Sequence, residues 1–484
     1  MQQRINATDE VATICRNLLR IDTSNYGDGS GPGERVAAEY CAELLTEVGL
    51  DVELFESAPG RTSVVTRLEG SNPDRPALVV HGHTDVVPAI ASDWLIDPFA
   101  GEERDGLLWG RGAVDMKNMD AMILAVVRQY VRQGRKPKRD LIIAMFADEE
   151  AGSLYGAHWA VANRPELFAG ATEAISEVGG FSTEVAGRRA YLVQTAEKGI
   201  SWLRLIANGR AGHGSAVNPD NAVTALAAAV ARIGRFEWPY QLTPTVTALL
   251  QGVADLTGLP FDADEARAPS RARSSLAEGK EGVDERSEEH AGCAVDSADS
   301  AAVVDPNSAA LREQIDALVA ALGPAAPFVG ATVRHTANAT CLEAGYKANV
   351  VPGTAAATVD CRWLPGFESQ GREQLVALAG DAVRVEPIHE DISLEVPFDG
   401  SLVDSMVDAL LAEDPGAAVL PYTLSGGTDN KALARLGITG YGFAPLQLPS
   451  DLDFVSMFHG VDERVPIAGL QFGTRVLDRL FASC

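Results

Sequence analysis

Positive charge is scarce in this chain of 484 residues. It contains 40 Lys and Arg against 67 Asp and Glu, which gives a formal net charge of −27 at pH 7. Nucleic acid phosphates and anionic lipid surfaces repel a protein of this charge, so we expect neither to be its main partner. The excess of acidic residues is interpreted as a contribution to solubility.

Long apolar runs are also absent. Residues 1–10 lack the apolar stretch of a signal peptide, and no later segment stays apolar for the length that a bilayer requires. We therefore expect a cytoplasmic protein without a membrane partner. The chain is long enough for about two or three domains, each with its own hydrophobic core.

Cysteine is sparse and dispersed, and phosphate-binding loops are missing. No two cysteines form a CxxC pair, so neither a disulfide framework nor a thiolate zinc site is indicated. We expect the thiols to be reduced and mostly structural. The glycines at 110 and 112 belong to neither a GxxxxGK(S/T) nor a GxGxxG pattern, which argues against a phosphate cradle there. The cysteines are Cys15, Cys41, Cys293, Cys341, Cys361 and Cys484.

The first 195 residues alternate between strand-like and helix-like stretches, the pattern of a βαβ sheet between helices. Residues 36–50 and 118–133 are predicted to be helices. Residues 76–80 and 141–146 are continuous apolar runs, as expected for strands buried on both faces of a mostly parallel sheet. The predicted fold class is α/β, with a mostly parallel sheet flanked by helices.

The sequence pattern changes near residue 197. Residues 201–207 and 356–363 are strand-like and residues 221–233 are helix-like, which predicts a smaller α+β domain. Within it, residues 262–306 contain almost no large apolar side chain. Burial cannot offset the entropy cost of ordering such a segment, so we predict a mobile insertion.

After about residue 396 the first pattern returns, with a predicted helix at 401–411 and a strand at 417–420. The sheet domain is therefore predicted to be split. Its two parts are residues 1–196 and 396–484, and the smaller domain, residues 197–395, is inserted between them.

Four polar clusters each follow an apolar run. They are 81–85 (HGHTD), 110–115 (GRGAVD), 148–150 (DEE) and Glu177. In open α/β sheets ligands bind beyond the carboxyl ends of the strands. The placement therefore favours one common site over scattered surface charge.

His83 and Asp85 are two residues apart, a spacing that puts both side chains on the same face of an extended chain. One can bind a metal ion while the other orients it, because a metal-bound imidazole usually donates its second N–H to a carboxylate or carbonyl. The alternative is a histidine at a strand end that only hydrogen-bonds its neighbour. His81 lies nearer the buried strand and is interpreted as a packing or hydrogen-bonding residue.

The remaining candidates also admit structural roles. Asp115 is either a ligand or the cap of the helix that begins near residue 118. The acids at 148–150 repel one another unless cations or protons compensate, and they also suit the N-terminus of a helix over 151–163. Taken alone, Glu177 fits a solvated acid and His459 fits a buried core histidine.

Together these side chains form a ligand set without thiolate that is compatible with zinc, cobalt or manganese. Two divalent ions bridged by Asp115 would bring four positive charges, against three negative charges from Asp115, Glu150 and Glu177, so one positive charge would remain. This residual charge would acidify a bridging water and stabilise an oxyanion.

Three segments resemble the signatures of the di-zinc amidohydrolase and exopeptidase family of aminoacylase, acetylornithine deacetylase, succinyl-diaminopimelate desuccinylase, glutamate carboxypeptidase and carnosine dipeptidase. They are 81–88 (HGHTDVVP), 110–117 (GRGAVDMK) and 148–152 (DEEAG), in the family's order and spacing. The resemblance covers nearly the whole chain. It implies a zinc-exopeptidase-like fold whose inserted domain is a lid and dimerisation domain.

The resemblance also implies which residues hold the two divalent metal ions, most typically zinc. One ion is bound by His83 and Glu177, the other by Glu150 and His459, and Asp115 bridges the two.

The resemblance implies three catalytic residues as well. Asp85 orients His83, and Glu149 passes a proton from the bridging water to the leaving amine. His213, in the segment 210–215 (RAGHGS), stabilises the oxyanion and commonly comes from the other subunit of a homodimer. A turn histidine before a helix at residue 219 is the alternative for His213.

Four residues are assigned to substrate binding by the same resemblance. Asn349 and Arg362 are expected to bind the substrate carboxylate, and Gly427 and Thr428 to form a substrate-binding loop. The alternatives are a loop amide for Asn349, a surface ion pair for Arg362 and a plain glycine turn for Gly427 and Thr428.

We therefore hypothesise a cytoplasmic, zinc-dependent hydrolase of an amide bond next to a free carboxylate, acting on an N-acyl amino acid or a short peptide. Arg362 would explain the carboxylate preference. The rival hypotheses are a non-catalytic binding or scaffolding protein and an aminopeptidase of related fold.

Overall fold

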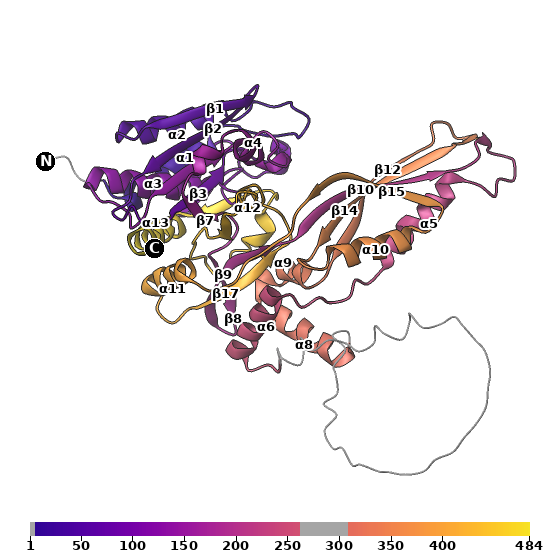
Figure 1. Ribbon diagram of the computed structural model, residues 1–484. Coiled ribbons are helices and arrows are strands. Elements are labelled where there is room, and N and C mark those ends of the chain that lie inside the picture. The colour runs from indigo at the N-terminus through magenta and orange to yellow at the C-terminus, as the bar shows by residue number, and fades with distance from the viewer. Residues whose placement is uncertain (1–4, 262–307) are drawn as a thin grey trace, which may run out of the picture.

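The computed structural model of the chain describes residues 5–261 and 308–484. The predicted insertion, residues 262–306, lies outside the described residues. In the described part, a large sheet lies between helices, and a smaller sheet extends away from it (Figure 1).

The large sheet is mixed, with a parallel centre and antiparallel edges. Its strands are β1 (Val52–Ala58), β2 (Arg61–Leu68), β3 (Ala77–His83), β6 (Leu141–Phe146), β7 (Ala171–Ser176), β8 (Phe181–Val185), β9 (Arg188–Glu197), β16 (Leu394–Glu395), β17 (Ala418–Leu424) and β18 (Thr439–Gly442). Their order is β1-β2-β6-β3-β7-β18-β9-β16, and β17 and β8 also pair with β9. β3 pairs in parallel with β6 and β7, whereas β1 and β16 pair antiparallel with their neighbours. The predicted α/β fold is confirmed, and antiparallel edges are added to it.

Helices bury both faces of the central strands. Alternate residues of β6 belong to two different apolar clusters, which explains its uninterrupted apolar sequence. One cluster joins the sheet to α1 (Ala7–Leu19), α2 (Arg35–Glu47), α3 (Lys117–Gln133), α11 (Ser401–Glu413) and α13 (Ile467–Ser483). The other joins it to α4 (Ala157–Asn163) and α12 (Asn430–Ala434).

The predicted helices agree with the observed ones except at their ends. Helix α3 matches the prediction of 118–133 to within one residue. Helix α2 ends at Glu47 rather than at residue 50, because Gly49 adopts a φ of +95°, a conformation that ends an α-helix.

The smaller sheet is antiparallel. Its strands are β10 (Gly199–Asn208), β12 (Thr336–Ala344), β14 (Thr354–Trp363) and β15 (Val383–Asp391), in the order β12-β14-β10-β15. Helices α5 (Ala222–Arg235) and α10 (Glu368–Ala379) cover one of its faces and share its apolar core. Two short strands, β11 (Gly212–His213) and β13 (Val350–Val351), pair beside it.

Part of the segment 197–395 packs on the large sheet instead. Helices α6 (Pro244–Thr257), α8 (Ala309–Ala320) and α9 (Ala326–Gly330) contribute to the apolar cluster of the large sheet.

A further small sheet contains β4 (Glu102–Arg104), β5 (Leu107–Trp109) and β19 (Arg464–Pro466). The boundaries at 196/197 and 395/396 stay a prediction.

Across residues 5–261 and 308–484, no single helix has the length and apolar character needed to cross a bilayer, and only the bent pair 309–320 and 323–333 meets both criteria together.

Candidate active site

Several candidate ligands lie where parallel strands end. β3 ends at His83, β6 ends two residues before Asp148, and β7 ends directly before Glu177. Because these strands are parallel neighbours, the side chains that follow them emerge at the same edge of the sheet. Asp115 comes from the segment before α3, and His459 follows a 3₁₀ turn at 455–457.

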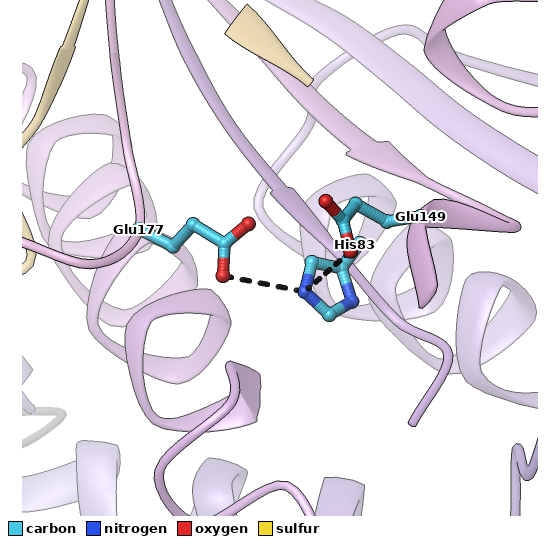
Figure 2. A group of neighbouring side chains, drawn as sticks. All are labelled: His83, Glu149 and Glu177. Atoms are coloured by element: carbon cyan, nitrogen blue, oxygen red, sulfur yellow. Dashed lines mark ion pairs between the residues drawn. The ribbon is translucent and has the colours of Figure 1, made fainter. Parts of the chain in front are cut away.

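Carboxylates surround the buried ring of His83. Its Nε2 atom lies 3.1 Å from Oδ1 of Asp115 and 3.4 Å from Oε2 of Glu177. Oε2 of Glu149 lies 3.8 Å from the same nitrogen. Figure 2 shows Glu177 and Glu149 approaching this nitrogen from different directions.

Asp115 connects His83 to the second histidine. While its Oδ1 faces His83, its Oδ2 lies 3.2 Å from Nε2 of His459. The same His459 nitrogen lies 3.1 Å from Oε2 of Glu150. The structure thus brings the five candidate ligands into one group, here named the His–carboxylate cluster: His83, Asp115, Glu150, Glu177 and His459.

Two sets of side chains could each hold a metal ion, because within each set the possible ligand atoms all lie within 4.8 Å of one another. One contains His83, Glu149 and Glu177, and the other contains His83, Asp115 and Glu150. Glu149, the expected base, thus belongs to one of these sets, although it lies farther from Nε2 of His83, at 3.8 Å, than Asp115 and Glu177 do.

A cavity of about 290 Å³ lies beside the cluster. Its lining includes four members of the cluster together with Glu149. Three residues expected to bind substrate also line it: Arg362, Gly427 and Thr428.

The model of peptidase family M20/M25/M40 matches residues 79–483 of the sequence. The chain belongs to this family. Two relatives show how far the similarity extends. The chain is 27% identical over 471 residues to the N-fatty-acyl-amino acid synthase/hydrolase PM20D1 of Xenopus tropicalis, and the aligned region covers 94% of this chain and 82% of that protein. It is 26% identical over 480 residues to aminoacylase-1 of Homo sapiens, which covers 97% of this chain and 94% of that protein.

Solved structures share the fold of this M20 chain. An M20 family metallo-carboxypeptidase, Sso-CP2 from Sulfolobus solfataricus, superimposes with a TM-score of 0.67 at 17% identity and covers 98% of this chain and 99% of that one. Human carnosine dipeptidase 1 gives a TM-score of 0.64 at 15% identity, with coverage of 98% and 96%. The M20 peptidase YXEP of Bacillus subtilis, described as dinuclear and metal-binding, gives 0.54 at 12% identity, with coverage of 98% and 98%.

Membership of the M20 family makes the protein a metal-dependent hydrolase of amide or peptide bonds. The predicted family and the prediction of an enzyme are confirmed. The alternative of a non-catalytic binding protein is set aside.

The chemistry of the His–carboxylate cluster suits a bound cation. Burial raises the pKa of Glu177 and Glu149 well above the ordinary value, and neighbouring carboxylates raise it further. Despite burial, which opposes protonation, Glu177 and Asp115 raise the pKa of His83 well above its usual range. Oε1 of Glu150 is buried without a hydrogen-bond partner. A concentration of negative charge and an unpaired buried oxygen are features that divalent ions compensate.

Asp85 holds two parts of the site in place. Nδ1 of His83 lies 3.0 Å from the carbonyl oxygen of Asp85, so this nitrogen donates and Nε2 faces the carboxylates. The side chain of Asp85 lies 3.4 Å from the same Nδ1. It also accepts hydrogen bonds from the backbone N–H groups of Glu149 and Glu150, both at 3.1 Å. Asp85 therefore contacts His83 mainly through its backbone and fixes the two glutamates through its side chain.

Arg362, Gly427 and Thr428 are held by specific contacts. Arg362 donates from Nε and Nη2 to the two carboxylate oxygens of Asp360, at 2.7 and 3.0 Å. The hydroxyl and N–H of Thr428 donate to the buried Glu197, at 2.7 and 3.0 Å. A Cβ at Gly427 would lie 2.8 Å from Cε of Lys431 and 3.0 Å from Cδ1 of Ile200, so a larger residue there would displace these side chains.

His213 and Asn349 lie away from the cavity within one chain. His213 pairs with Val350 through β11 and β13, and the backbone carbonyl of Asn349 accepts a hydrogen bond from Gly214. Both side chains are exposed, and neither lines the cavity. Their expected roles stay predictions.

The sequence reasoning missed several residues that line the cavity. Trp202 and His389 are neighbours only through the pairing of β10 with β15, which the sequence does not reveal. His158 and Asp391 approach to 3.6 Å from distant segments. Lys431 was accessible to prediction, because it lies two residues after the loop at 425–429, in the first turn of α12, and that loop was already expected to bind substrate.

Proposed function

We propose that the protein is a zinc-dependent hydrolase that cleaves an amide bond next to a free carboxylate in an N-acyl amino acid or a short peptide. The observation that carries this proposal is the position of Asp115, whose two carboxylate oxygens face His83 at 3.1 Å and His459 at 3.2 Å. Such an arrangement suits a carboxylate that bridges two metal ions.

In this proposal each ion has two further ligands from the chain. His83 and Glu177 hold one ion, and Glu150 and His459 hold the other. When bound, the ions acidify a water molecule and polarise the scissile carbonyl. Cobalt or manganese suits the same nitrogen and oxygen ligands, so zinc is the proposed rather than the exclusive ion.

Glu149 is the proposed general base. It takes a proton from the attacking water and gives it to the leaving amine, so no covalent intermediate forms. Burial, the main cause of its raised pKa in the metal-free site, acts in the direction that this task requires, because a group that must accept and then release a proton works best near the operating pH.

Arg362 is proposed to recognise the substrate carboxylate. Because Asp360 occupies the Nε and Nη2 edge of the guanidinium, the Nη1 side is left to meet the substrate. Asn349 is proposed to assist it, and Gly427 and Thr428 to shape the loop against which the substrate lies. Since His213 and Asn349 are outside the cavity of one chain, both are proposed to act from the partner in a cytoplasmic homodimer.

Three related substrates test the proposal: a free dipeptide, its N-acetylated form and its C-amidated form. We expect cleavage of the N-acetylated form and loss of activity on the C-amidated form, together with about two equivalents of divalent ion per chain. Activity that persists on the C-amidated form and disappears on the N-acetylated form would favour an aminopeptidase of related fold.

A further inference from the structure

One wall of the cavity has no hydrogen-bonding groups on its side chains. It is formed by Val178, Leu424, Phe328 and Phe458. The rings of Phe328 and Phe458 are stacked, with centroids 6.1 Å apart and an interplanar angle of 18°. Phe328 belongs to α9, and Phe458 follows the 3₁₀ turn at 455–457.

This wall is fixed next to the His–carboxylate cluster by the chain itself. Val178 directly follows Glu177, and Phe458 directly precedes His459. A carbonyl positioned at the cluster therefore has its attached groups within reach of the wall. Burying a polar group there without a partner costs free energy, whereas burying an alkyl or aryl group is favourable.

A second layer of rings stands behind the first. The centroid of Phe454 lies 5.6 Å from that of Phe458, and the centroid of Phe181 lies 6.4 Å from that of Phe328. Phe181 and Phe454 are themselves 5.6 Å apart and almost fully buried. The four rings therefore pack against one another as one cluster.

The far side of this ring layer borders a second cavity of about 450 Å³. Phe181 and Phe454 line that cavity, whereas Phe328 and Phe458 line the cavity beside the cluster. The four rings are thus a partition between two cavities, and they limit the depth of the one beside the cluster.

We propose that Phe328 and Phe458 determine substrate specificity by receiving an apolar group next to the scissile bond and limiting its length. This inference rests on the proposed function, because it assigns a part of the substrate to one wall of the same site. The group is an alkyl or aryl group, supplied by the acyl chain or by the amino acid side chain.

Two substrate series distinguish these sources. The first keeps leucine and lengthens the N-acyl group from acetyl to dodecanoyl. The second keeps the acetyl group and varies the side chain from alanine to phenylalanine. A shift of preference in the first series alone places the acyl chain at the wall, and a shift in the second alone places the side chain there.

Opposite substitutions of Phe328 give opposite expectations. Phe328→Ala deepens the cavity. We therefore expect kcat/KM for the longest substrate, divided by kcat/KM for the shortest, to rise by about tenfold or more. Phe328→Trp should change the ratio in the other direction. Phe458→Leu should act in the same direction as Phe328→Ala.

Phe55→Ala is the matched control. Phe55 stacks on Trp159 with centroids 5.4 Å apart, in a separate apolar cluster. It therefore reports what the loss of a packed ring does to all substrates alike. If the Phe328 variants lower kcat/KM for every substrate by one common factor, as Phe55→Ala does, the specificity role is overturned.

Calorimetric binding of the carboxylates from acetate to dodecanoate to the zinc-loaded variants gives a readout without turnover. Binding of the amino acids from alanine to phenylalanine is measured in the same way, so that both sources of the apolar group are covered. The reversal of preference between Phe328→Ala and Phe328→Trp is expected in the series whose source occupies the wall, and identical profiles of the two variants in both series would refute the inference. If the unmodified protein hydrolyses no member of either series, the proposed function fails while this binding comparison still decides the role of the wall.

Discussion

The side-chain nitrogen of Asn25 lies 2.9 Å from Oδ2 of Asp85, and both residues are buried next to the His–carboxylate cluster. The same nitrogen donates to Asp148 at 3.1 Å, while the Asn25 carbonyl accepts from Arg61 at 2.8 Å. Arg61 in turn forms an ion pair with the buried Glu34. The amide group of Asn25 thus donates to two carboxylates, and one of them is the Asp85 side chain that fixes Glu149 and Glu150.

Asn25→Asp should therefore weaken metal binding. The new carboxylate keeps the shape of the side chain but replaces a donor by a like charge beside Asp85 and Asp148. Residues that hold a ligand in place typically change metal affinity by roughly 10- to 100-fold, and we expect a loss in that range. Zinc affinity measured by competition with a chelator checks this.

Asn17→Asp serves as the control for Asn25→Asp, because Asn17 donates to Tyr40 at 3.0 Å away from the site. Equal zinc affinity in the two variants would show that Asn25 does not support the cluster.

Glu149→Gln should separate proton transfer from metal binding. The amide keeps the size of the side chain but cannot accept the proton, so kcat should fall by a factor on the order of 10² to 10⁴. Metal content should stay unchanged. The neighbouring Glu150→Gln should instead lose metal along with activity, because Glu150 is a proposed ligand. Steady-state kinetics and elemental analysis of both variants test this, and a metal-depleted Glu149→Gln protein would contradict the assigned role.

Local patterns predicted much of the site. The apolar runs of β3 and β6 end in polar residues, so His83 and the acids at 148–150 could be placed at one sheet edge from the sequence alone. Local patterns could not place His459, since a single histidine in an apolar setting carries no spacing signal, and its assignment as a ligand came from the family resemblance alone. Only the folded chain shows it 3.1 Å from Glu150.

Support residues were beyond the reach of sequence reasoning for a similar reason. Asn25 lies in a loop, and its neighbour Ser24 reaches Val86 through an isolated bridge rather than a named strand. Glu197 holds Thr428 although 230 residues separate them, as the hydrogen bond at 2.7 Å shows. Such partners depend on strand order and register, which periodicity does not specify.

Asp120→Asn should stabilise the metal-free protein, and more so at higher pH. Both carboxylate oxygens of Asp120 are buried without a partner, and burial raises its pKa from 3.8 to about 8. Between these values the unfolded chain ionises this group while the folded chain keeps it protonated. The folded state therefore loses relative stability by on the order of 1.4 kcal/mol per pH unit in that window.

Asparagine does not titrate, so the advantage of Asp120→Asn should grow from about pH 4 to about pH 8 and then level off. Denaturant unfolding of both chelator-treated proteins across this range measures the difference. A difference that stays constant with pH would mean that Asp120 has the same pKa in the folded and unfolded states.

His213 provides a test of the proposed homodimer, because it is exposed and does not line the cavity of its own chain. If the partner supplies it, His213→Ala and Glu149→Gln should each be inactive alone but partly active together. In the mixed dimer, the site with an intact Glu149 belongs to the His213→Ala chain and receives His213 from the Glu149→Gln partner.

Random pairing of equal amounts of the two chains makes about half of the dimers mixed, and one site in each mixed dimer is intact, so roughly a quarter of the normal activity should return. Co-expression with two affinity tags isolates the mixed dimer, in which kcat per intact site should match that of the unmodified protein. The pair His213→Ala and His213→Ala/Glu149→Gln is the control, since neither chain can supply the histidine and no activity should return. A tagged mixed dimer that stays inactive would exclude exchange of His213 between subunits, because every other residue of one complete site is present in it.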